Sequence, residues 1–251
     1  MLLRRMLSRK WLFATLLVVV GAFVLIRLGV WQLDRLEQRR AFNAQVESAR
    51  LQSVLDLNME QPADIAAMEW RPAQIAGKYD FENQVAIRNQ YYGDQYGYHI
   101  LTPLRSDPST GSGPAGLAVL VDRGWIPADG NSTPADWRRY DEVGQVRAKG
   151  QIRLGSGKPA IGGVADALPE GGSKLEIWNN ADVENISVQL PYPVLPVYIQ
   201  ADAHPADAEP PIPFQPELEL TEGPHFGYAM QWFIFAAILF FGYPFYLRKQ
   251  D

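Results

Sequence analysis

Two long apolar stretches stand near opposite ends of the sequence, and the chain between them alternates apolar and polar positions over much shorter distances. The first stretch, residues 11–26 (WLFATLLVVVGAFVLI), carries no charge and continues past Arg27 into LGVW. The second, residues 226–247, also lacks a formally charged side chain. About 20 apolar residues are needed to cross the hydrocarbon core of a bilayer. The pattern therefore predicts two transmembrane helices, at residues 11–32 and 225–247.

Basic residues in the short tails indicate the orientation of these spans. Lysines and arginines are enriched on the cytoplasmic side of membrane proteins. The tails, residues 1–10 and 248–251, contain Arg4, Arg5, Arg9, Lys10, Arg248 and Lys249. A cleaved signal peptide is the alternative for the first stretch, but no small-x-small cleavage pattern follows its apolar core. We therefore expect an uncleaved anchor, both termini in the cytoplasm and residues 33–224 outside it.

The region between the spans reads first as a helix and then as strands. Residues 32–50 (QLDRLEQRRAFNAQVESAR) contain no Gly or Pro and predict a helical stalk. Short runs rich in β-branched and aromatic residues follow, separated by Gly, Pro, Asn and Asp. These runs are residues 70–80, 84–89, 96–104, 117–127, 146–154, 175–179 and 197–202. One short helix, residues 181–190, is expected with Asp182 as its cap. Together they predict an extracytoplasmic α+β domain with a mainly antiparallel, barrel-like β-sheet.

Two segments of this domain have the composition of loops. Residues 105–116 (RSDPSTGSGPAG) lie between two apolar strands and predict a flexible hairpin tip. Residues 204–224 are rich in proline and acidic residues and predict an extended connector that leads into the second span.

Composition excludes several classes of function. The absence of cysteine removes disulfides, thiolate metal sites and thiol catalysis, and a net charge of −5 argues against nucleic-acid binding. The three histidines, His99, His204 and His225, form no pair at metal-ligand spacing. The segment GSGKP at residues 155–159 lacks the spacing of a phosphate loop, and no nucleophile motif is present. We therefore expect a protein that is not an enzyme.

The start of the second span contains the strongest candidate site. His225 follows Pro224, and on a helical wheel it shares one face with Ala229, Trp232, Ala236 and Tyr243. The two alanines allow a flat group or another helix to approach closely. An imidazole at a membrane face, among aromatic and small residues, has the properties of an axial haem ligand. The alternative is a histidine that helps the aromatic residues to anchor the span.

Two further stretches contain residues with more than one interpretation. In VLVDRGWIP, Arg123 can present its charge to an acidic group, or pair with a nearby acid while Trp125 covers the core and Gly124 permits a turn. We favour the structural interpretation. GKYD, with Gly77 and Tyr79, is interpreted as the turn at the end of a strand.

Taken in order, these segments resemble one family. The matching segments are LGVWQLDRLEQR, GKYD, AIRNQ, GYHILTPL, VLVDRGWIP and PHFGYAMQWF. This order is similar to that of the Surfeit-locus family of cytochrome c oxidase assembly proteins, and the similarity covers nearly the whole chain. The resemblance implies a role in maturing haem–copper oxidases, around insertion of haem a into the catalytic subunit. It also implies a haem-iron ligand at the start of the second span, which is His225 here, beside Tyr228 and Trp232. Gly77, Tyr79, Arg123, Gly124 and Trp125 match family motifs and are expected to support the fold.

The expected partners are the catalytic subunit of cytochrome c oxidase, haem a synthase and the lipid bilayer, without nucleic acid. A cofactor-free scaffold that stabilises an oxidase subunit is the alternative function. No long Arg- and Ser-rich transit segment precedes Trp11, which favours a bacterial cytoplasmic membrane over a mitochondrial inner membrane.

Overall fold

The computed structural model describes residues 2–106, 116–158, 163–169, 173–203, 209–213 and 218–249. The chain forms two compact units, one made of Met1–Gln45 with Leu218–Asp251 and the other of Val46–Glu217. Most of the hairpin tip predicted at 105–116 and part of the connector predicted at 204–224, including His204, lie outside the described residues.

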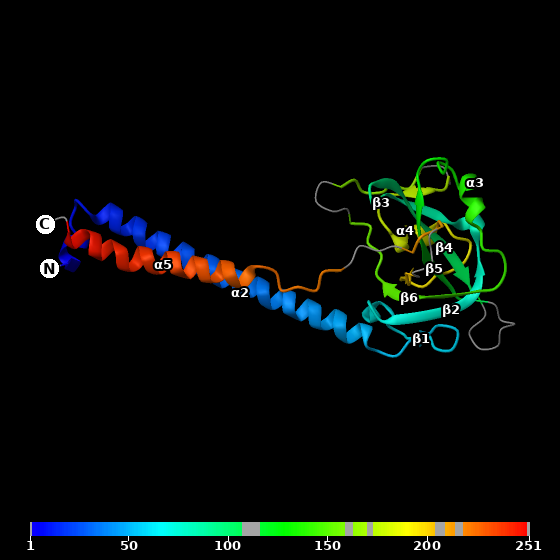
Figure 1. Cartoon of the computed structure of the whole chain (residues 1–251), viewed down its shortest axis with the longest axis horizontal. Coiled ribbons are helices and arrows are strands. Elements are labelled where there is room, and N and C mark those ends of the chain that lie inside the picture. Colours follow the sequence, from blue (N-terminus) through cyan, green and yellow to red (C-terminus); the bar gives the residue numbers. More distant parts are fainter. Residues whose placement is uncertain are drawn as a thin grey trace. The chain divides into compact units, whose positions relative to one another are not determined.

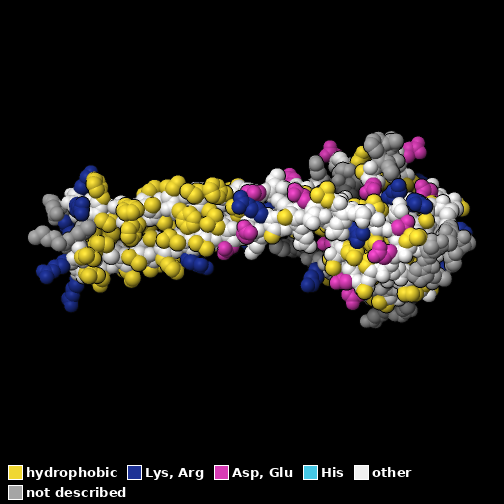
Figure 2. Space-filling model, turned by 90° about the horizontal axis from the view of Figure 1, so that it is seen from below, with side chains coloured by type: hydrophobic (Ala, Val, Ile, Leu, Met, Phe, Trp, Pro, Cys, Tyr) yellow, Lys and Arg dark blue, Asp and Glu magenta, His cyan; other side chains and the backbone are white. Residues whose placement is uncertain are grey.

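The first unit consists of helices. These are α1 (Leu2–Met6), α2 (Leu12–Arg50) and α5 (His225–Arg248). Both α2 and α5 are long and apolar enough to cross a membrane, and the helical stalk predicted at 32–50 is confirmed as the second half of α2. Within this unit α2 and α5 run side by side, and both termini lie at the same end (Figure 1). Hydrophobic side chains cover much of the outer surface of this pair, and Lys and Arg gather at the end that holds the termini (Figure 2).

Small and polar side chains at seven-residue intervals form the contact between these two helices. On α2 the buried positions along one line are Thr15, Ala22, Gly29, Leu36 and Asn43. On α5 the buried positions include Ala229 and Ala236. A seven-residue repeat keeps one seam facing a partner helix. Small residues in that seam leave room for side chains of the partner helix, such as the ring of Phe233 beside Gly29.

Glycine is required where aromatic rings cross this seam. A Cβ on Gly29 would lie 2.4 Å from the ring of Phe233, so a larger residue would force that ring to move. Nearer the termini, the hydroxyl groups of Thr15 and Tyr243 lie 2.7 Å apart. The ring of Trp11 meets that of Tyr246 edge to face at 6.2 Å. These contacts fix the register of α5 on α2.

The segment before α5 is tied to α2 by polar contacts. The Arg39 guanidinium donates to the carbonyl oxygens of Glu219 and Thr221, and Asn43 Nδ2 donates to that of Leu220 at 2.9 Å. Arg40 and Glu222 form a bidentate ion pair with N–O distances of 2.8 and 2.9 Å. The last of these bonds is at Glu222, three residues before His225. The contacts therefore hold the chain against α2 directly before α5 begins.

The second unit contains one sheet of eight strands with short helices. The strands are β1 (Leu55–Asp56), β2 (Pro72–Tyr79), β3 (Val85–Tyr92), β4 (Gln95–Arg105), β5 (Ala118–Pro127), β6 (Val146–Arg153), β7 (Ile177–Trp178) and β8 (Tyr198–Ala201). The helices are α3 (Pro134–Trp137) and α4 (Val183–Val188), with 3-10 turns at Ala66–Met68, Phe81–Asn83 and Arg138–Tyr140. All seven predicted strands are present, and so is the helix capped by Asp182, which accepts from the backbone N–H of Asn185. The sequence did not predict β1 or α3.

The pairing of these strands corrects the predicted mainly antiparallel barrel. The order is β1-β2-β6-β8-β5-β4-β3-β7, and the sheet is mixed because β1–β2, β3–β7 and β5–β8 are parallel. The hairpin between β3 and β4 gives an antiparallel pair from local sequence. Long connections bring β7 and β8 back beside earlier strands, and their direction is not visible in local patterns. A further β2–β4 pairing covers only two residue pairs, so the sheet is not a clear barrel.

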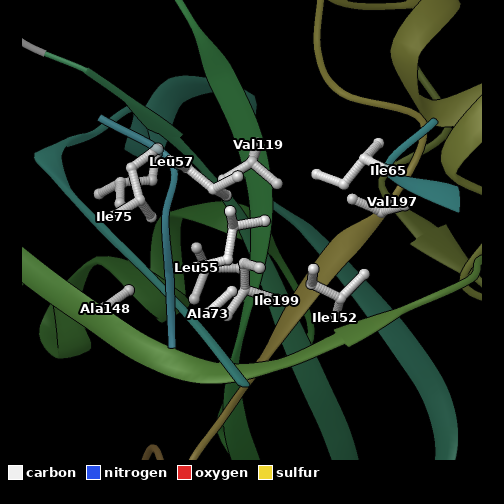
Figure 3. Packing of buried hydrophobic residues seen from close by; sticks show 12 residues of the cluster. Leu55, Leu57, Ile65, Ala73, Ile75, Val119, Ala148, Ile152, Val197 and Ile199 are labelled. Carbon is white, nitrogen blue, oxygen red and sulfur yellow. The ribbon is translucent and has the colours of Figure 1, made fainter. Parts of the chain in front are cut away.

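The largest core cluster among the described residues of this unit lies between strands of the sheet (Figure 3). It joins residues of β1, β2, β5, β6 and β8, and Ile75, Val121, Ile152 and Ile199 are fully buried in it. Alternating positions of β2 and β6 point into this cluster, as the buried pattern along each strand shows. This alternation is the pattern of strands with one face in the core.

Gly77 allows two strands to approach closely. It lies within β2, opposite Val146 of β6, and a Cβ at this position would lie 2.2 Å from the carbonyl oxygen of Arg105. The interpretation of GKYD as a turn was therefore wrong for Gly77 and Tyr79, which are strand residues; the chain leaves the strand at Asp80.

We predict that Gly77→Ala destabilises the second unit, because the added methyl group must displace backbone. The expected loss is about 2 to 3 kcal/mol, or about 4 to 10 °C in melting temperature followed by tryptophan fluorescence. Gly93→Asn is the control, because Gly93 has a φ of +59° with nothing within 4 Å, and asparagine tolerates that conformation. Equal losses for both variants would show that the close approach at Gly77 is unimportant.

Candidate functional site

His225, the sequence-predicted haem ligand, begins α5 with Pro224 as the preceding cap residue. Its ring is partly exposed, and its Nδ1 lies 2.8 Å from Oε1 of Gln32 on α2. An amide oxygen can only accept, so Nδ1–H is the donor in this bond and Nε2 is the ring nitrogen that Gln32 does not hold. Metal-binding histidines commonly have their second nitrogen held in this way.

The helical face predicted to carry the cofactor is largely covered by α2. Ala229 and Ala236 are buried, Trp232 is partly buried, and Tyr243 contacts Thr15. The sequence allows a flat group or another helix as the neighbour of these alanines. In the structure the neighbour is the helix α2. Gln231 is exposed, and the polar bond from this part of α5 to α2 is the one between His225 and Gln32.

The residues around His225 fit a haem in one respect and restrict it in another. They offer an oriented imidazole, and imidazole is an axial ligand that haem iron takes from proteins. The seam at Ala229 is filled, however, so a planar group would have to lie along the flank of α5. Tyr228 is 48% exposed on that flank, and Trp232 is partly exposed beside it. Within the described residues, no group of three His, Asp or Glu could hold a metal ion without such a cofactor.

A second histidine occupies a site in the second unit that the sequence did not predict. His99 on β4 is 6% exposed and Asp122 on β5 is 5% exposed. Nδ1 of His99 lies 3.0 Å from each carboxylate oxygen of Asp122. The backbone N–H of Gly124 also donates to Asp122 Oδ1 at 3.1 Å. A buried carboxylate requires such partners, because an unpaired charge is costly to remove from water.

An irregularity in strand pairing brings these two residues together. His99 pairs with Trp125 and Leu101 pairs with Asp122, so the register shifts by one residue between them. Gly124 takes a φ of +120° at this point, where a Cβ would lie 2.3 Å from the backbone of Ile212. A bulge of this kind redirects side chains next to it. Gly124 thus provides a mid-strand bulge rather than a terminal turn.

The electrostatics of this pair follow from its burial. Burial opposes the charged form of the His99 ring, but attraction to Asp122 and their hydrogen bond overcome this and raise its pKa. Tyr198 on β8 lies nearby, and burial together with the Asp122 charge raises its pKa to about 12. The site therefore combines a basic imidazole, a carboxylate and a neutral phenol.

The arginine of the same strand is buried among aromatic rings, and within the described residues it forms no ion pair with an acid. Arg123 is 8% exposed, and its guanidinium lies over the rings of Tyr79 and Phe81, with carbon-to-centroid distances of 5.0 and 5.3 Å. It also donates to the carbonyl oxygen of Tyr140, and burial lowers its pKa. Trp125 is 2% exposed and completes the core. Arg123 is therefore poorly placed to receive a ligand from solution.

One signal in the sequence pointed to the His99 pair. Asp122 interrupts the apolar strand sequence AVLV at residues 118–121, and a charge in a buried strand needs a partner. His99 lies in the preceding strand, and its separation from the connecting loop along the chain is similar to that of Asp122. The two residues can therefore face each other in a hairpin. The bulge that completes the match depends on a glycine conformation, which the sequence pattern does not reveal.

We predict that the His99–Asp122 pair makes stability depend on pH. The folded pKa of His99 is raised, so its contribution is complete below the unfolded pKa of about 6.5 and disappears as pH rises through the folded pKa. Urea unfolding between pH 5.5 and 9 tests this. The wild type should lose stability with rising pH relative to His99→Gln/Asp122→Asn, which leaves no unpaired buried charge. Parallel curves for the two proteins would contradict the prediction.

Comparison with known proteins agrees with the resemblance seen in the motifs. The chain is 23% identical to Surfeit locus protein 1 of Mus musculus over 220 residues, which cover 82% of this chain and 66% of the mouse protein. It is 23% identical to the SURF1-like protein of Rickettsia bellii over 239 residues, which cover 93% of this chain and 90% of that protein. The sequence model of the SURF1 family matches residues 19–237, which include most of α2, the whole sheet and the first half of α5. The predicted family is confirmed: the chain belongs to the SURF1 family.

Proposed function

We propose that this protein is a non-enzymatic, membrane-bound assembly factor for cytochrome c oxidase that holds haem, most simply haem a, at His225. Membership of the SURF1 family supports the role in oxidase assembly. The observation that supports haem binding is the hydrogen bond between His225 Nδ1 and Gln32. It orients the ring and leaves one nitrogen for iron.

In this proposal, four side chains of the membrane unit contribute to haem binding. Nε2 of His225 binds the iron, and Gln32 keeps the ring oriented. Tyr228 and Trp232 supply aromatic surface along the flank of α5. The haem would be cargo destined for the catalytic subunit, and haem a synthase would be the partner that supplies it. Transient binding through one protein ligand is consistent with later release.

The proposed location is a bacterial cytoplasmic membrane with both termini in the cytoplasm and the second unit outside. Both termini lie at the same end of the helix pair (Figure 1), and the basic residues of α1 and of the last turn of α5 gather there. This distribution agrees with the preference of Lys and Arg for the cytoplasmic side.

A cofactor-free scaffold for an oxidase subunit is the second candidate, and one observation favours it. The stripe with Ala229 and Ala236 is buried against a helix of the same chain, so small residues at this position need no haem to explain them. In that case His225 serves the helix pair through its bond to Gln32.

We predict that protein purified after co-expression with haem a synthesis shows a Soret band, and that His225→Ala loses it. The reason is the loss of the iron ligand from an otherwise unchanged helix. The matched control is Gln231→Ala, because Gln231 is exposed on α5 and its variant should keep the band. Oxidase assembly that depends on the protein, without a band in any variant, would support the scaffold.

We also predict that Gln32→Leu weakens haem retention by about tenfold, because loss of an outer hydrogen bond to a metal-binding histidine typically costs 10- to 100-fold in affinity. Gln32→Glu keeps an accepting oxygen and should retain most of the haem. Haem transfer to apomyoglobin measures the dissociation rate of each variant. Equal rates for leucine and glutamate variants would show that Gln32 does not position His225.

A further inference from the structure

An open cleft with a volume of about 430 Å³ lies over the His99–Asp122 pair. Its walls come from β3, β4, β5 and β8 and from the segments around residues 156–158 and 179–181. Ligand-binding clefts in proteins commonly have volumes of about 300 to 1,000 Å³. The second unit therefore contains a cavity of sufficient size for a small molecule, built on rigid strands.

His99 is the group in this cleft best suited to bind a ligand. Its Nδ1 is held by both oxygens of Asp122, so Nε2 is the ring nitrogen that remains for a ligand. In the protonated ring Nε2–H is a charged donor, and charged donors form the stronger hydrogen bonds to anions. Tyr198 also lines the cleft and adds a neutral hydroxyl group.

The charge of the cleft favours an anion. Among the described residues that line it, Asp122 is the only acidic one, and its charge is matched by His99. Lys158, which is exposed, adds a positive charge at the rim. These same lining residues include no arginine. One lysine and one imidazole suit a single carboxylate better than a phosphate, which proteins usually surround with several donors.

The remaining walls are partly apolar. Ile87, Leu101 and Ala181 line the cleft, and Ile87 and Leu101 belong to a buried cluster beneath it. A ligand with a carboxylate on an apolar body would bury its apolar part against them while the carboxylate reached His99. We propose that this cleft binds such an amphipathic carboxylic acid, with His99 as its principal donor and Lys158 as a second one.

Two chemical sources share this chemistry, namely a carboxylated porphyrin and an aliphatic acid. The proposal does not depend on haem binding at His225. The test is NMR spectroscopy of the full-length protein in nanodiscs, with isotope-labelled histidine. The chain has only three histidines, so their ring signals are few. Hexanoate is the aliphatic probe, hexanamide its uncharged counterpart, and iron-free coproporphyrin the porphyrin probe, which cannot use an axial ligand.

Titration of the His99 ring signals gives a dissociation constant for each probe. We expect hexanoate or coproporphyrin to bind at least about tenfold more tightly than hexanamide, because the amide loses a charged hydrogen bond. Tighter binding of coproporphyrin identifies a porphyrin acid as the source, and tighter binding of hexanoate identifies an aliphatic acid. Lys158→Ala, at the exposed rim, should weaken binding of the preferred acid by about two- to fivefold. His225→Ala should leave it unchanged.

His99→Gln/Asp122→Asn removes the ring signal, so tryptophan fluorescence is used to measure binding by that variant. We expect it to bind the preferred acid at least about tenfold more weakly, and its melting curve establishes that it is folded. The proposal is overturned if neither acid shifts His99 at millimolar concentration, if hexanamide binds as well as hexanoate, or if the folded double variant binds normally. In each of those cases the pair would be a structural ion pair.

Discussion

The close contact between α2 and α5 is the constraint on which the membrane unit depends. Lipid surrounds both helices in the proposed location, so apolar burial gives little reason for them to associate. Tight packing has to provide it, and Gly29 and Ala229 make that packing possible. The same contact sets the register that places Gln32 beside His225. A bulkier seam would therefore disturb both the helix pair and the orientation of the histidine.

A different constraint organises the second unit. Asp122 carries a charge into a strand that is otherwise buried, and the strand is stable only if that charge is matched. The bulge at Gly124 and the hydrogen bonds from Gly124 and His99 provide the match. Arg123, the next residue, points to the other face and is covered by Tyr79 and Phe81. One irregular stretch thus directs two adjacent charged side chains to opposite faces of the sheet.

The two histidines have different partners, and this difference has chemical consequences. The amide oxygen beside His225 orients the ring without adding a charge, an arrangement compatible with metal ligation. The carboxylate beside His99 favours the protonated ring, which suits an anionic ligand. The proposed haem site and the proposed carboxylate site therefore use the same residue type for distinct tasks, each within its own unit.

Much of the architecture follows from the sequence because its signals are local. Uncharged apolar runs predicted both long helices, short runs rich in β-branched and aromatic residues predicted seven strands, and Asp182 marked the start of α4. The ordered motifs also predicted the family, and the position of His225 at the first residue of α5 followed from Pro224. Each of these features depends on neighbouring residues, so the sequence by itself determined them.

Other features depend on residues far apart in the chain, and only the tertiary structure decided them. Parallel pairing of β5 with β8 joins segments more than 70 residues apart, and no local pattern specifies its direction. The helical wheel placed Ala229 and Trp232 on one face but could not show that α2 covers the alanine. The His99–Asp122 pair joins two strands beside a bulge in β5, and local sequence does not specify that pairing. Local sequence determined the elements, whereas long-range packing decided which chemical groups meet.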